Sequence, residues 1–256
     1  MRIHKRYAAI GLLAAAATGA SAQQRPPIRQ LGATVGKSTE TFVRVTAVRP
    51  LSNGSLLVND VGGRRVVLFN PQLSSFTVVA DSTSATANAY GGRTGGLSAY
   101  RGDSSIFVDP SSLSMLVIDP SGKVARVISV PRAQDAQMLA SPLGNPVLAP
   151  NGKLVYRSSP QIQTRFTGAA PAGGAAGFVP PEIPDSAPVL RIDLATRQVD
   201  TLGYIKTPKI KIDMTRDDNG NFRATSQINP LPTVDDWAMT PAGAVAFVRG
   251  KDYHVD

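Results

Sequence analysis

Cysteine is absent from this chain of 256 residues, and histidine occurs only twice. The lack of cysteine excludes a disulfide scaffold, thiolate metal sites, cysteine nucleophiles and a lipid-modified cysteine anchor. Charged residues make up 18% of the chain, below the roughly 25% usual for globular proteins, which argues against a coiled coil or long surface helices. The apolar share of 42% still supports a hydrophobic core, so we expect a folded protein.

The scarcity of histidine limits the chemistry further. After residue 22 only His254 remains, and the chain has no Gly-x-Ser-x-Gly motif. The chain therefore lacks the nucleophile motif of a serine hydrolase and the usual ligand set of a zinc hydrolase. We interpret His254 as a structural residue in a strand. We expect no catalytic residue, no metal ligand and no cofactor.

The chain also lacks an apolar run long enough to span a bilayer. Its longest run, residues 7–17, follows the basic residues Arg2, Lys5 and Arg6 and precedes the small residues 20–22. This order is typical of a secretory signal peptide, and eleven apolar residues are too few for a membrane helix. We predict a signal peptide over residues 1–22 with cleavage after Ala22. The protein is then secreted or periplasmic, and its mature part has no membrane span.

The positive charge is not concentrated in one place. The formal net charge of +9 falls to +6 when the three basic residues of the predicted signal peptide are removed. The densest group is Lys206, Lys209 and Lys211, and no aromatic residues interleave with it. A nucleic-acid-binding protein would concentrate its charge on one face, so we expect no nucleic-acid partner. A weak attraction to anionic material of the cell envelope fits the charge better.

Short β-branched runs separated by turn residues fill the chain after residue 40. Related strand–turn segments carry glycine at positions 54, 102, 152 and 243, which are 48, 50 and 91 residues apart. Each unit contains about four strands, and four antiparallel strands in this length are typical of a β-propeller blade. The sequence predicts an all-β fold, a β-propeller of four-stranded antiparallel blades. About four blades are present, the last incomplete.

The predicted organisation has two parts after the signal peptide. Residues 23–40 form an extended tail, and residues 41–256 form the partial propeller. The long segment between Gly152 and Gly243 contains a Gly/Ala/Pro-rich insertion at residues 158–187 and an extra hairpin over residues 209–228. The sequence stops inside the fourth unit, so we expect this chain to be the N-terminal part of a longer propeller with six blades.

Three segments carry a resemblance to a known group. Residues 50–60 (Pro-Leu-Ser-Asn-Gly-Ser-Leu-Leu-Val-Asn-Asp), 114–123 (Ser-Met-Leu-Val-Ile-Asp-Pro-Ser-Gly-Lys) and 235–243 (Asp-Asp-Trp-Ala-Met-Thr-Pro-Ala-Gly) resemble bacterial six-bladed β-propeller proteins of the NHL/TolB-like group. The resemblance covers roughly residues 40–256. It implies the fold but not an activity, because that group contains scaffolds, ligand sensors and a few enzymes.

Four residues are candidates for a ligand site or for packing between blades. Asp60 and Asp109 follow equivalent strands, and Asp236 precedes Trp237, the single tryptophan. Aspartate at a turn accepts hydrogen bonds from nearby amides, and a buried tryptophan can pack blades together, so each residue also has a structural interpretation.

Two functions follow from these observations. The first is an exported, non-catalytic scaffold that binds a protein or glycan ligand of the cell envelope at its loop rims. The alternative is a divalent-metal-dependent hydrolase or lactonase. Lactonases of the gluconolactonase type share six blades and hold a metal ion with acidic and asparagine side chains in the central channel. If three or more Asp, Glu or Asn side chains meet at one point near the propeller axis, the metal-dependent enzyme is favoured over the scaffold.

Overall fold

The computed structural model describes residues 28–34, 36–160, 183–216 and 222–256. The predicted signal peptide and residues 161–182 of the predicted insertion lie outside the described residues. The chain divides into two units, Met1–Val35 and Gly36–Asp256, and all strands belong to the second. The described strands are antiparallel throughout, and the single described α-helix, α1 (Ala136–Ala140), has five residues. The predicted all-β class is confirmed.

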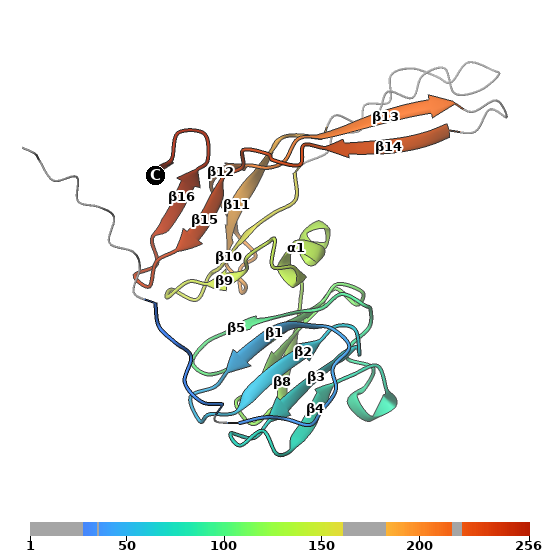
Figure 1. Ribbon diagram of the computed structural model, residues 1–256, viewed down its shortest axis with the longest axis vertical. Helices are drawn as coiled ribbons and strands as arrows, with labels where there is room; N and C mark the ends of the chain where they lie inside the picture. The colour runs from blue at the N-terminus through green and yellow to red at the C-terminus, as the bar shows by residue number, and fades with distance from the viewer. Residues whose placement is uncertain (1–27, 35, 161–182, 217–221) are drawn as a thin grey trace, which may run out of the picture. The chain divides into compact units, whose positions relative to one another are not determined.

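The second unit is a propeller arrangement of small antiparallel sheets, each built from consecutive strands (Figure 1). The first sheet contains β1 (Val45–Pro50), β2 (Leu56–Asp60), β3 (Arg65–Phe69) and β4 (Phe76–Ala80). The second contains β5 (Gly96–Ala99), β6 (Ser105–Asp109), β7 (Ser114–Ile118) and β8 (Val124–Ser129). The third contains β9 (Val147–Leu148), β10 (Leu154–Arg157), β11 (Ser186–Ile192) and β12 (Val199–Lys206).

The fourth blade and an extra hairpin complete the described strands. The fourth blade contains β15 (Asp236–Met239), β16 (Val245–Arg249) and β17 (His254–Val255). Between the third and fourth blades, β13 (Ile210–Arg216) pairs with β14 (Phe222–Ile228), which confirms the predicted hairpin. β11 begins at Ser186, so it overlaps the end of the predicted insertion.

The central strands are buried on both faces, which explains their continuous apolar runs. All five residues of β6 are buried. Successive side chains of a strand point to opposite faces, so Phe107 packs against the first sheet while Ile106 and Val108 pack against the third. β10 repeats this arrangement, with Tyr156 toward the second sheet and Val155 toward the fourth. A sheet with a neighbour on each face needs apolar residues on both.

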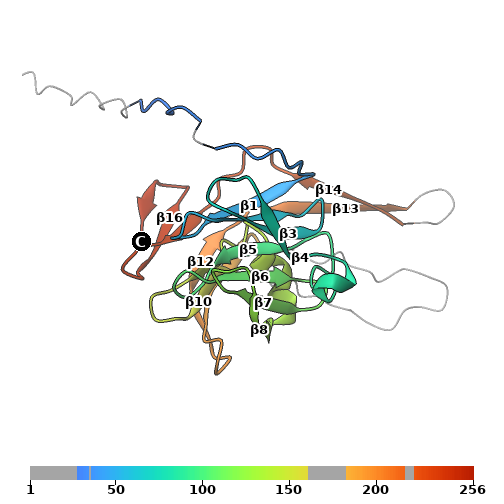
Figure 2. The same ribbon diagram turned by 90° about the horizontal axis from the view of Figure 1, so that it is seen from below.

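The connections at the two ends of the blades differ in kind, which Figure 2 allows the reader to follow from a second side. At one end, which we call the turn rim, short turns join the first and second strands of each blade. Their glycines all have positive φ, between 59° and 87°. Adjacent turns touch, since the amide and hydroxyl of Ser52 both hydrogen-bond to Asp103 at 2.9 and 2.7 Å.

The opposite end, which we call the loop rim, carries the long connections. Residues 81–95 connect the first blade to the second there, residues 130–146 connect the second to the third, and the described residues of 207–235 connect the third to the fourth. They include α1 and the β13–β14 hairpin. Loops on a rigid scaffold are where binding residues concentrate, so the loop rim is the place to search for a site. None of the described helices is long and apolar enough to cross a membrane.

Candidate functional site

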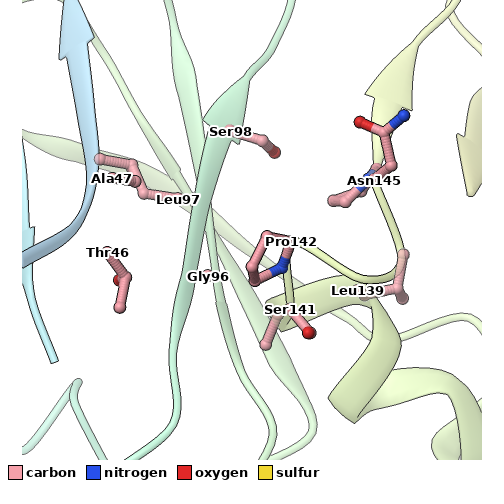
Figure 3. A pocket seen from close by; sticks show the side chains of 11 residues that line it. Thr46, Ala47, Gly96, Leu97, Ser98, Leu139, Ser141, Pro142 and Asn145 are labelled. Carbon is pink, nitrogen blue, oxygen red and sulfur yellow. The ribbon is translucent and has the colours of Figure 1, made fainter. Parts of the chain in front are cut away.

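A groove opens at the loop rim where the first strands of the first two blades face α1. Its inner hollow, about 220 Å³, lies between β1, β5 and the segment that leads from α1 to β9 (Figure 3). Thr46 of β1, Ser98 of β5 and Asn145 of that segment supply polar groups, and Leu97 and Leu139 supply apolar surface. A mixed lining of this kind is typical of a small-ligand site.

An outer hollow of about 420 Å³ adjoins the inner one. The two share Thr46, Ala140, Ser141 and Pro142, so we treat them as one feature and call it the rim groove. The outer hollow adds Arg44, which directly precedes β1, and a further set of loop residues: Val61, Arg93, Thr94, Gly95, Gln137, Met138 and Leu143.

The charge of the rim groove has one sign. Among the described residues that line it, Arg44 and Arg93 are the charged ones, and no aspartate, glutamate or histidine lines it. Both arginines are exposed. In the described part of the chain, neither guanidinium makes a hydrogen bond or an ion pair. The groove therefore offers hydrogen-bond donors and positive charge to a ligand.

Asn59 connects β1 to the start of β5, which form two sides of the rim groove. Its fully buried Nδ2 donates to Thr46 Oγ1 at 3.1 Å and to the carbonyl of Gly95 at 2.8 Å. Its Oδ1 accepts a hydrogen bond from the hydroxyl of Tyr90 at 2.9 Å. A buried amide with all these partners fixes the spacing between β1 and the start of β5.

The helix α1, which forms the third side of the rim groove, approaches β5 very closely. A Cβ at Gly96 would overlap the backbone of Ala140, the last residue of α1. The absence of a side chain at this position lets α1 pack directly on β5. The run of residues 91–96, which is rich in glycine and lacks the dinucleotide-binding spacing, thus forms the loop that enters β5 and lines the groove.

The two sequence-predicted aspartates Asp60 and Asp109 lie in equivalent places, at the ends of the second strands of the first and second blades. Fully buried Asp60, at the end of β2, accepts hydrogen bonds from the amides of Arg44 (2.9 Å), Gly63 (3.0 Å) and Val43 (3.3 Å). The Nε of Arg65 adds a fourth contact at 3.3 Å. The carboxylate therefore fastens the end of the second strand to the chain that enters the first.

Asp109 makes the same connection in the second blade. It is 1% exposed and accepts hydrogen bonds from the amides of Gly91 (3.1 Å) and Ser111 (3.2 Å) and from the hydroxyl of Ser112 (2.6 Å). Gly91 belongs to the chain that enters β5. We call this arrangement the carboxylate clasp. Both carboxylates accept hydrogen bonds from backbone amides, and each adds one side-chain partner, Arg65 for Asp60 and Ser112 for Asp109.

In the third and fourth blades the clasp carboxylate lies in the chain that precedes the first strand, and groups in or just after the second strand donate to it. Buried Asp135, which precedes α1, accepts hydrogen bonds from the hydroxyls of Tyr156 (2.7 Å) and Ser158 and pairs with Arg132 at 3.1 Å. Asp235, just before β15, accepts from the amide of Gly250 at 3.1 Å and pairs with Arg249. Each blade thus has one carboxylate at this junction.

Trp237 lies away from the rim groove lining, between the third and fourth blades. It is 3% exposed and packs in a cluster with Val155, Val189, Ile205 and Phe247. Its carbonyl accepts a hydrogen bond from Asn145 Nδ2 at 3.4 Å, which connects this cluster to a groove residue. The indole ring lies in the core of the blade interface.

Asp236 is exposed, and its carboxylate accepts a hydrogen bond from the amide of Trp237 at 2.8 Å. Burial lowers the pKa of the Arg157 guanidinium, and the charge of Asp236 acts in the opposite direction. Asp60, Asp109 and Asp236 share no hydrogen-bond partner among the described residues.

The structure also locates the residues that bear on the metal alternative. His254 lies exposed in β17 between Asp252 (2.8 Å from Nδ1) and Asp256 (3.0 Å from Nε2), and Asp252 raises its pKa most. Across residues 28–34, 36–160, 183–216 and 222–256, no group of three or more acidic or histidine side chains is placed to hold a metal ion.

The residues of the rim groove were not identified from the sequence. Thr46, Ser98 and Asn145 are ordinary strand and loop residues, and nothing in their local pattern indicates a ligand site. Arg93 lies in the glycine-rich run 91–96, whose composition is typical of a connecting loop. The groove exists because strands of different blades meet, and that meeting is not encoded by neighbouring residues.

Comparison with known proteins gives distant structural neighbours and no family. No protein-family model and no curated protein matches the chain. Virginiamycin B lyase from Staphylococcus aureus is 11% identical, with 83% of this chain and 68% of that chain covered and a TM-score of 0.37. A gluconolactonase from Xanthomonas campestris is 15% identical, with 80% and 69% covered and a TM-score of 0.36. Similarity at this level carries no argument about activity.

Proposed function

We propose that this protein is an exported, non-catalytic β-propeller that binds a glycan of the cell envelope in the rim groove. The observation that carries the proposal is the lining of the groove, where hydroxyl and amide groups alternate with apolar side chains. Sugars present hydroxyls and apolar ring faces, which such a lining complements. The absence of carboxylates and histidine among the described lining residues removes the usual general acids and bases.

A glycan fits the groove better than a protein partner does. A stable protein interface needs about 800 Å² on each side, with an apolar centre. The inner hollow of about 220 Å³ is lined by small side chains and suits one or two sugar units. Export and a ring of six NHL/TolB-like blades remain part of the proposal.

Blocking the groove tests the proposal. Ser98→Phe places a ring in the inner hollow, and we expect it to abolish binding of maltotriose, chitotriose or trigalacturonate, measured by isothermal titration calorimetry on the full chain. The matched control is Thr77→Phe, because Thr77 is exposed on the outer strand β4 and does not line the groove. Binding that survives Ser98→Phe, or no binding of any of the three sugars by the unmodified protein, would contradict the proposal.

The metal-dependent alternative has its own test. Gluconolactone hydrolysis is measured with added Mg²⁺, Ca²⁺ or Zn²⁺ and again after addition of EDTA. We expect no turnover above the rate of a buffer blank. Hydrolysis that EDTA abolishes would replace the binding proposal with the lactonase alternative.

Export is tested by the new N-terminus of the secreted protein. Signal peptidase cleavage after Ala22 leaves Gln23 as the first residue. We expect Edman sequencing or mass spectrometry of the protein from the periplasm or medium to begin at Gln23. An uncleaved Met1 on protein confined to the cytoplasm would contradict export.

A further inference from the structure

We infer that the rim groove selects glycans that carry an oxyanion, a carboxylate or a phosphate, and that Arg44 and Arg93 bind it. This inference rests on the proposed function and adds the ligand's charge. Both arginines line the outer hollow, and the described lining holds no carboxylate. Arginine binds carboxylate and phosphate through paired N–H donors, which an ammonium group does less well.

The backbone of Arg44 is held by the first carboxylate clasp. Its amide donates to Asp60 Oδ1 at 2.9 Å, and Asp60 is fully buried. The buried carboxylate accepts hydrogen bonds from backbone amides and pairs with Arg65. The Arg44 guanidinium forms no ion pair among the described residues. The side chain projects from a fixed point at the start of β1.

The loop that carries Arg93 is anchored on both sides. Before Arg93, the guanidinium of Arg64 donates to the carbonyls of Tyr90 (3.0 Å) and Gly91 (2.8 Å), and Gly91 donates to Asp109. After Arg93, the carbonyl of Gly95 accepts from Asn59 at 2.8 Å. A loop held at both ends presents its charged side chain at little cost in ordering when a ligand binds.

The nearby acidic side chains have partners other than the guanidiniums of Arg44 and Arg93. Asp60 and Asp109 are buried in their clasps, and Glu40 pairs with Arg65 at 2.9 Å. None of these carboxylates forms an ion pair with Arg44 or Arg93 among the described residues, so both guanidiniums are available to an incoming anion. The inner hollow, with Thr46, Ser98 and Asn145, then contacts the neutral part of the same sugar.

Calorimetry with charged and neutral sugars tests the inference. We expect trigalacturonate or glucose 6-phosphate to bind at least tenfold more tightly than maltotriose or glucose, respectively. Arg93→Ala and Arg44→Ala each weaken binding of the charged sugar about tenfold, the effect of one lost hydrogen bond to a charged group. Binding of the neutral sugars is unchanged in both variants. The stronger response of the carboxylate or the phosphate identifies which oxyanion the site prefers.

Arg101→Ala is the matched control, because Arg101 is an exposed arginine on the turn rim. Equal affinity for charged and neutral sugars, or equal loss with Arg101→Ala and Arg93→Ala, would overturn the inference and leave groove binding intact. Failure of every sugar to bind would overturn the proposed function as well. Circular dichroism of each variant confirms that the fold is retained.

Discussion

Replacing Trp237 with alanine is expected to lower the free energy of unfolding by about 3–5 kcal/mol, the usual cost of removing a large buried aromatic side chain. Trp237 is 3% exposed and contacts residues of both the third and the fourth blade. Its removal leaves a cavity where these sheets meet, and packing supplies most of the stabilisation there. Chemical denaturation followed by far-UV circular dichroism measures the loss.

Two variants sharpen this prediction. Trp237→Phe keeps most of the ring volume, so we expect it to lose much less stability than Trp237→Ala. Leu231→Ala removes an apolar side chain that is 86% exposed and should change stability little. Equal stability of Trp237→Ala and the unmodified protein would show that this tryptophan does not hold the blades together. A ligand-stacking role would then be favoured.

Replacing Asp60 with alanine is expected to cost about 3 kcal/mol of stability, because a buried acceptor of several hydrogen bonds is lost. The amides of Val43, Arg44 and Gly63 would lose their acceptor, and the guanidinium of Arg65 would lose its buried partner. Asp119→Ala is the control, since Asp119 accepts amide hydrogen bonds in a turn open to solvent. Comparable losses in both variants would contradict a special role for the clasp.

The clasp also predicts a dependence on pH. Burial raises the pKa of Asp60, but hydrogen bonds from Arg44, Gly63, Val43 and Arg65 together hold it below its ordinary value of 3.8. The folded protein binds this proton less readily than the unfolded chain does, so the contribution to stability is present above pH 3.8 and is lost as pH falls through the lower folded value. We expect Asp60→Ala to remove part of the fall in stability below about pH 4, as seen in denaturation curves from pH 7 to pH 2.

The strands were predictable because their signals are local. β3 and β4, for example, are each a short run with β-branched residues bounded by turn residues, as expected for the chain after residue 40. The turn glycines 54, 102, 152 and 243 all adopt positive φ, as a tight turn requires. The helix α1 was not predicted, because five residues are too few to establish a helical period.

The site could be predicted only in part. The shared position of Asp60 and Asp109 after equivalent strands was visible in the sequence, and both take the same role. The sequence did not indicate that Asp135 and Asp235, which precede the first strand of their blades, take the same role. Those carboxylates precede the blade instead of following its second strand, so the repeat does not align them.

The sequence by itself determined the all-β class, the period of the blades and the places where the chain turns, because each depends on a few neighbouring residues. Only the tertiary structure decided which carboxylates clasp the blades, which face Trp237 covers and where the rim groove opens. Those features depend on contacts such as Asn59 with Gly95 and Asn145 with Trp237, which join residues 36 and 92 positions apart. Contacts at such separations form when whole sheets pack, and no local pattern of side chains specifies them.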